Sequence, residues 1–142
     1  MSTTEKLNGY GPLAGVKVVE LCEWVAAPAC VRCLSEMGAT VIKVEPPYGD
    51  AQRTQGPGFG CEQTDMEDPT IDLNNTNKNF VSINLKNEEG MKFMKKLLAD
   101  ADIFVNNLRD KALNKMGLDY ETLHKEFPTL IWAQMRGYGE YG

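Results

Sequence analysis

Residues 16–45 read VKVVELCEWVAAPACVRCLSEMGATVIKVE, and this stretch decides the fold. Its first six residues, 16–21, and its last six, 40–45, are short runs rich in β-branched side chains, which is typical of strands. Between them, Pro28 can open a helix, because its missing N–H is not needed in the first turn, and Gly38 can end that helix after Met37. A strand, a helix and a strand in this order predict a parallel βαβ unit with a right-handed crossover.

The rest of the sequence continues this alternation after one long interruption. Residues 46–76 are rich in Gly, Pro, Asp, Asn and Thr and show no apolar periodicity, and a loop of that length often carries function. The alternation then resumes with predicted strands at 79–85, 102–106 and 130–135. Helices are predicted after Asn87 as cap, over 111–115 with Gly117 as the stop, and over 120–126 with Asp119 as cap. The sequence therefore predicts an α/β fold with a doubly wound, Rossmann-type parallel sheet of about five strands.

Charge and hydropathy exclude several kinds of partner. The formal net charge is −5, whereas nucleic-acid and anionic-membrane surfaces need a basic excess. No apolar run approaches the roughly 18 residues of a membrane span. The N-terminal residues 1–6 also lack the apolar stretch of a signal peptide. We therefore expect no nucleic-acid partner and no membrane partner, and a cytoplasmic location.

Cys30 and Cys33 form a C-x-x-C pair that could indicate a metal or redox site. A zinc site would need a second pair of ligands, which only Cys22, Cys61 and His124 could supply. A redox pair should lie at the exposed start of a helix. The simpler interpretation makes both cysteines small apolar residues on one helix face, buried and unreactive. We prefer this interpretation and expect neither a metal site nor a disulfide.

Cationic and amide side chains follow two of the predicted strands. Lys86 ends one strand, and Asn107 and Arg109 follow the next. Because the carboxyl ends of parallel strands line the ligand crevice of such a sheet, these side chains can converge there. Several cations at one crevice suit a small polyphosphate ligand. The alternative is that each is a solvated surface residue.

A dinucleotide cofactor is a weaker interpretation. Residues 137–142 match G-x-G-x-x-G literally, but a dinucleotide site places its glycines in the first turn between strand and helix. That turn, residues 23–28, contains no glycine. We therefore expect neither a nicotinamide nor a flavin cofactor.

Several ordered blocks resemble class III coenzyme A (CoA) transferases, the family of formyl-CoA transferase and carnitine CoA-transferase. The blocks are GPLAGVKVVEL at 11–21, GATVIKVEP at 38–46, ADIFVNN at 101–107 and GYG at 137–139. The resemblance implies a flexible tail over residues 1–12, followed by the N-terminal part of a large Rossmann-type CoA-binding domain over 13–142. In the family, a C-terminal stretch completes this domain and two chains interlock as a homodimer.

The resemblance also implies a reaction. Class III enzymes move CoA from an acyl-CoA to a free carboxylic acid, through a mixed anhydride and then a thioester on an aspartate. That aspartate would lie beyond Gly142, so no residue of this chain is assigned as catalytic and the chain alone is expected to be inactive. The CoA thioester is a substrate, and no covalently bound cofactor is expected. The finer similarity is to members that act on 2-hydroxy acids of amino-acid fermentation.

The family's CoA contacts can be transferred to matching positions of this sequence. Val25 and Pro46 differ from formyl-CoA transferase, which has a glutamine and an arginine there. The matching residues lie after the first strand, around the third, after the fourth and on the following helix: Trp24, Val25, Ala26, Ile83, Lys86, Asn107, Leu108, Arg109, Lys115 and Met116.

Two other functions remain open. An acyl-CoA racemase of the same fold would share these N-terminal blocks, although the long loop at 46–76 favours a transferase. A non-catalytic module that binds CoA or a nucleotide is the alternative from a different class of protein.

Overall fold

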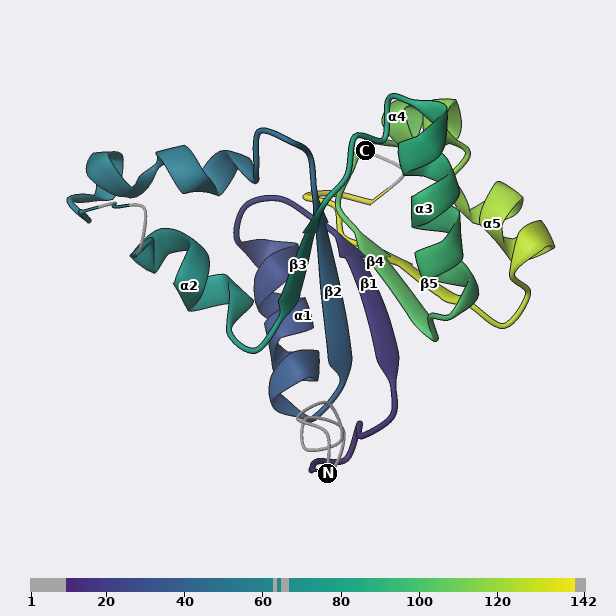
Figure 1. Ribbon diagram of the computed structural model, residues 1–142, viewed down its shortest axis with the longest axis horizontal. Coiled ribbons are helices and arrows are strands. Elements are labelled where there is room, and N and C mark those ends of the chain that lie inside the picture. Colours follow the sequence, from purple (N-terminus) through teal and green to yellow (C-terminus); the bar gives the residue numbers. More distant parts are fainter. Residues whose placement is uncertain (1–9, 63, 65–66, 140–142) are drawn as a thin grey trace.

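The computed structural model describes residues 10–62, 64 and 67–139, so most of the predicted tail lies outside the described residues. The described chain forms a single parallel sheet of five strands in the order β3-β2-β1-β4-β5 (Figure 1). This confirms the predicted Rossmann-type sheet. The strands are β1 (Lys17–Leu21), β2 (Thr40–Glu45), β3 (Asn79–Ser82), β4 (Ile103–Asn106) and β5 (Ile131–Gln134).

The strand order creates a switch point beside β1. The chain first builds outward from β1 to β2 and β3, then crosses back to add β4 and β5 on the other side of β1. The loops that leave β1 and β4 therefore diverge, although their last residues, Leu21 and Asn106, are paired in the sheet. Ligands of open α/β sheets bind in the crevice at this point.

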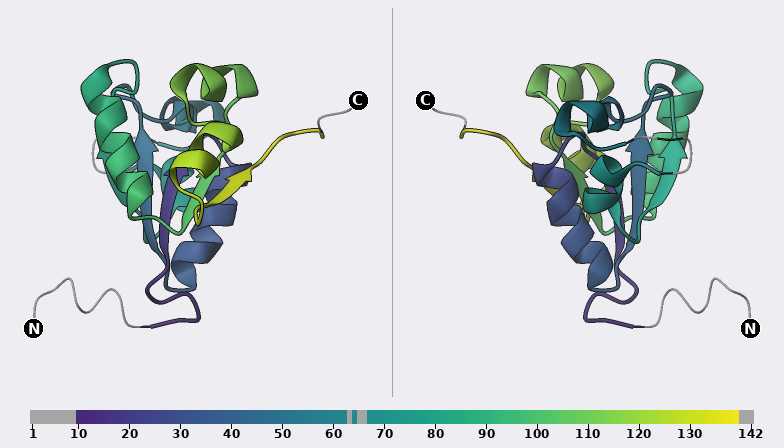
Figure 2. Two further views of the ribbon diagram at one scale, coloured as in Figure 1. Left: turned by 90° about the vertical axis from the view of Figure 1, so that its right-hand side faces the viewer. Right: turned by 90° about the vertical axis from the view of Figure 1, so that its left-hand side faces the viewer.

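Helices cover both faces of the sheet (Figure 2), and none among the described residues is long and apolar enough to cross a membrane. On one face, Val18 and Val41 pack with Val31 of α1; on the other, Val19 and Phe104 lie in one apolar core with residues of α3, α4 and α5. The alternation of side chains along each strand thus supplies both cores. The helices are α1 (Ala26–Glu36), α2 (Pro69–Asn75), α3 (Glu88–Ala99), α4 (Asp110–Met116) and α5 (Tyr120–Glu126), with 3₁₀ turns η1 (Ala51–Thr54) and η2 (Gly56–Phe59).

The predicted helix boundaries are confirmed where a side chain or a glycine sets them. Asn87 accepts a 2.7 Å hydrogen bond from the Gly90 N–H and caps α3, and Asp119 accepts a 3.0 Å bond from the Thr122 N–H and caps α5. Gly117 ends α4 with φ of 64°, a conformation that other residues rarely adopt.

Three predictions about secondary structure are wrong: the start of one helix, the absence of another, and the length and burial of one strand. Helix α1 begins at Ala26 rather than at Pro28, because a proline is tolerated anywhere in the first turn, where N–H groups lack helical partners. Residues 69–75, predicted as loop, form α2, which Asp68 caps through the Ile71 N–H. Strand β3 ends at Ser82 and is largely exposed, because it lies at the edge of the sheet.

The burial predicted for the C-x-x-C cysteines is also wrong, since Cys30 and Cys33 are exposed. The buried stripe of α1 contains Ala27, Val31 and Ser35, at a spacing of four residues, and both cysteines fall on the other side of the helix. Cys22, just after β1, is buried instead.

Alkylation should distinguish these thiols. Iodoacetamide is expected to modify Cys30 and Cys33 in the native protein but to leave Cys22 unmodified until the chain is unfolded in urea. Burial shields the Cys22 thiol and raises its pKa, which removes the reactive thiolate. Peptide mass spectrometry of native and unfolded samples measures the difference. Equal native rates at Cys22 and Cys30 would contradict the described packing.

Candidate functional site

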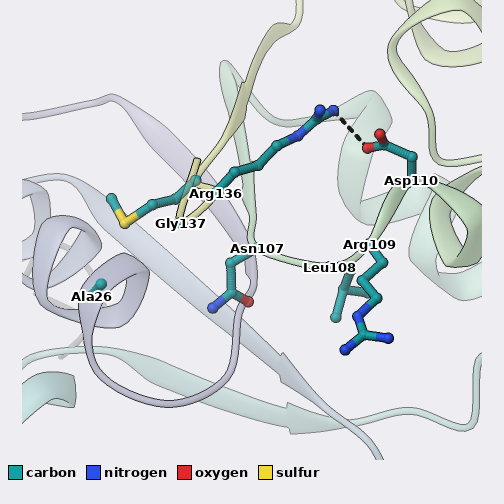
Figure 3. A pocket seen from close by; sticks show the side chains of 8 residues that line it. Ala26, Asn107, Leu108, Arg109, Asp110, Arg136 and Gly137 are labelled. Carbon is teal, nitrogen blue, oxygen red and sulfur yellow. Dashed lines mark hydrogen bonds and ion pairs between the residues drawn. The ribbon is translucent and has the colours of Figure 1, made fainter. Parts of the chain in front are cut away.

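Two adjacent pockets lie at the carboxyl ends of the strands. The first, of about 510 Å³, is lined by Ala26 at the start of α1, by the segment 107–110 after β4 and by the segment 135–137 after β5 (Figure 3). The second, of about 320 Å³, lies between the ends of β1, β2 and β3. Leu108 lines both pockets, so they meet at the loop that follows β4.

The second pocket is mainly apolar. Its walls come from the ends of three strands, from the loop after β2, from the loop after β4 and from the end of α4. Lys86 and Glu23 bring charge to this lining, and partial burial, with Asp50 as a second cause, raises the pKa of Glu23. The apolar lining comprises Leu21, Val44, Pro46, Pro47, Ile83, Leu85, Leu108 and Met116.

Most of the predicted contact residues line these pockets. Ala26, Asn107, Leu108 and Arg109 line the first, and Ile83, Lys86, Leu108 and Met116 line the second. Trp24 and Val25 are exposed on the turn between β1 and α1, outside both linings. Lys115 is exposed on α4 and also lies outside both linings.

Asn107 differs from the other predicted residues because its carboxamide is already engaged. Its Oδ1 accepts a 3.0 Å hydrogen bond from the Glu23 N–H, and its Nδ2 donates a 2.7 Å bond to the Glu23 carbonyl oxygen. Asn107 therefore ties the loop after β4 to the turn after β1. Lys86 and Arg109 are exposed, and within the described part of the chain neither side chain takes part in an ion pair. Both cations are thus available to a ligand.

The end of β5 braces the first pocket, which the sequence did not predict. Gln134 Nε2 donates to the Leu108 carbonyl oxygen at 2.7 Å and to Asp110 Oδ1 at 3.0 Å. Arg136 pairs with the same Asp110 oxygen at 2.6 Å (Figure 3). Side chains from the end of β5 therefore hold the loop that carries Arg109.

The sequence also did not reveal a group of four charged side chains, Glu20, Lys43, Asp50 and Lys78, which we term the buried ion network. None of the four side chains has exposed surface. Lys43 Nζ lies 3.1 Å from Glu20 Oε1 and 3.0 Å from Asp50 Oδ2, and Lys78 Nζ lies 2.7 Å from Glu20 Oε2. The signal in the sequence was that Glu20 and Lys43 stand next to apolar residues on both sides within their strands.

Lys43 is the centre of this network. Burial alone would lower the pKa of Lys43, but the nearby Glu20 and Asp50 carboxylates outweigh burial and raise it above its usual value. Lys43 Nζ also donates a 2.7 Å hydrogen bond to the Cys22 carbonyl oxygen. A charged Lys43 thus contacts the backbone of Cys22, the residue after β1 that also lines the second pocket.

Comparisons with family models and with curated relatives agree with each other. The chain matches the model of CoA-transferase family III over residues 13–142. It is 49% identical over 130 residues to (R)-2-hydroxy-4-methylpentanoate CoA-transferase of Clostridioides difficile, covering 92% of the chain and 33% of that relative. It is 47% identical over 135 residues to cinnamoyl-CoA:phenyllactate CoA-transferase of Clostridium sporogenes, covering 95% of the chain and 33% of the relative.

A solved structure shows the same similarity in three dimensions. A CAIB/BAIF family protein from Brucella suis matches with a TM-score of 0.85 and 38% identity, over 94% of this chain and 35% of that one. The chain therefore spans about a third of the length of the relatives it matches.

Proposed function

This chain belongs to CoA-transferase family III, and from that premise we propose that it forms the part of an acyl-CoA:carboxylate CoA-transferase that binds the CoA thioester. One observation carries this proposal. Residues that the family resemblance assigns to CoA come from separate segments of the chain, yet seven of them line two pockets that share Leu108. The exposed cations Lys86 and Arg109 suit the phosphates of CoA, and the apolar second pocket suits a less polar part of the same ligand.

For the full-length protein we propose transfer of CoA between 2-hydroxy acids of amino-acid fermentation. The support lies in the relatives named for 2-hydroxy-4-methylpentanoate and phenyllactate, at 49% and 47% identity. Because the match covers only a third of these relatives, we assign the nucleophilic aspartate and the acid-binding residues to the remainder of the polypeptide. An interlocked homodimer and a cytoplasmic location belong to the same proposal.

Replacing Lys86 or Arg109 with alanine tests the CoA site. Each change is expected to weaken CoA binding about tenfold or more, because a charge-assisted hydrogen bond contributes on the order of 1.5–3 kcal/mol. In the full-length enzyme the loss should appear as a raised KM with little change in kcat, since these contacts act on CoA and not on the reacting carbonyl. Titration calorimetry with CoA and steady-state kinetics measure the two effects.

Lys96→Ala is the matched control. Lys96 is an exposed cation in the last turn of α3, outside the linings of both pockets. Its removal should leave CoA affinity unchanged while altering the net charge equally. If all three variants bind CoA as the wild type does, the two pockets are not the CoA site.

A further inference from the structure

Trp24 has a backbone conformation that is unusual for a large side chain. Its φ is 68°, in the left-handed region that glycine adopts readily and other residues rarely do. Such a conformation persists only when surrounding groups fix it, and it often occurs at functional sites. Trp24 lies in the turn between β1 and α1, two residues before Ala26 in the lining of the first pocket.

Three consecutive residues of this turn are each held by a partner from elsewhere in the fold. The Cys22 carbonyl oxygen accepts from Lys43, and both backbone groups of Glu23 bond to Asn107. The Trp24 N–H donates to Asp50 Oδ1 at 3.1 Å. These contacts restrain the turn in its strained conformation.

The buried ion network supplies two of these contacts, those at Cys22 and Trp24. Asp50 is 2% exposed; its Oδ1 accepts from the Gln52 N–H at 2.9 Å as well as from Trp24, and its Oδ2 lies against Lys43. Lys78, which pairs with Glu20, also donates a 2.8 Å bond to the Pro28 carbonyl oxygen in the first turn of α1. The network therefore reaches the backbone on both sides of Trp24.

We propose that Asp50, oriented by Lys43, is a positioning residue that holds Trp24 in its left-handed conformation and so sets the turn that borders the CoA pocket. The identity of the ligand rests on the function proposed above, whereas the effect of Asp50 on the turn does not. A residue that served only for packing would lower stability without changing the conformation of this turn.

Asp50→Asn and Asp50→Ala separate these roles. The asparagine is nearly isosteric, and its single oxygen can accept either from the Trp24 N–H or from Lys43 but not from both, so one contact remains. Alanine removes both contacts. Leu98→Ala is the control, because Leu98 is buried in α3 on the opposite face of the sheet and its truncation destabilises the core.

Two readouts are compared between each variant and the wild type: NMR backbone chemical shifts of Trp24, Val25 and Ala26, and CoA affinity by calorimetry. The melting temperature of each variant is measured beside them as a record of stability. Asp50→Ala is expected to move the Trp24 shifts away from left-handed values and to weaken CoA binding about tenfold, because the released turn must be ordered again when CoA binds. Asp50→Asn, which keeps one oxygen, is expected to show smaller changes of the same sign. Leu98→Ala is expected to lower the melting temperature and to change neither readout.

Left-handed shifts for Trp24 in Asp50→Ala would overturn the positioning role, and so would an equal movement of these shifts in Leu98→Ala. Shifted resonances with unchanged CoA affinity would overturn the link between the turn and the ligand. If the wild type itself does not bind CoA while Asp50→Ala still releases Trp24, the positioning role stands and the proposed function fails.

Discussion

Replacing Lys43 with methionine is expected to lower the free energy of unfolding by about 3–5 kcal/mol, the usual cost of removing one partner from a buried ion pair. Lys43 contacts Glu20 and Asp50, and the side chains of all three have no exposed surface. Methionine fills a similar volume but carries no charge. Asp50 would lose its only ion-pair partner among the described residues, while Glu20 would keep Lys78 alone. Urea-induced unfolding followed by circular dichroism gives the difference.

Two further variants sharpen this test. Lys92→Met removes an exposed lysine that pairs with Glu88 on α3 at 2.8 Å, and such surface pairs contribute no more than about 1 kcal/mol. Adding Asp50→Asn to Lys43→Met should recover part of the lost stability, because the uncompensated carboxylate is then gone. A Lys43→Met variant as stable as Lys92→Met would show that the network contributes little to folding.

Truncating Phe104 to alanine should be similarly costly, at about 3–5 kcal/mol, because the cavity adds to the lost burial. Phe104 is fully buried in β4 and belongs to the same core cluster as Met94 and Leu98 of α3. The variant should unfold at lower urea concentration with an unchanged dependence on urea, since the fold itself is retained.

Phe93→Ala provides the same chemical change at a different level of burial. Phe93 lies next to Met94 on α3 but is 46% exposed, so its truncation should cost less than about 1 kcal/mol. Similar losses for Phe93→Ala and Phe104→Ala would be inconsistent with the way α3 packs on the sheet.

The apolar cores around the sheet and the buried ion network also determine the geometry of the candidate site. The apolar cores fix the sheet, and its strand order places the ends of β1 and β4 side by side while their loops diverge. The buried ion network then fixes the turn after β1, and Gln134 and Arg136 fix the loop after β4. Lys86 and Arg109 remain exposed beside these supports.

The sequence by itself determined the features that depend on neighbouring residues. The strands and helix within residues 16–45 follow from local β-branched runs and from Gly38, and the caps at Asn87 and Asp119 follow from side chains that bond N–H groups three residues away. Ordered sequence blocks also identified the family, and alternation of strands and helices predicted the parallel sheet. Helix α2 carried a local signal as well, Asp68-Pro69, which the polar composition of its surroundings obscured.

Tertiary structure alone decided which side chains are buried and which polar groups meet. Cys30 and Cys33 were predicted to be buried, but only the packing of α1 on the sheet selects the face that carries Val31. The position of Asn107 after a strand was visible in the sequence, but the bonds between its carboxamide and Glu23 follow only from the fold. The network joins β1, β2 and two later loops, and its charges are tolerated in the interior only because the complete fold pairs them. The propensity of a residue for helix or strand carries no information about such pairs. Each buried charge is stabilised by a partner from another part of the sequence.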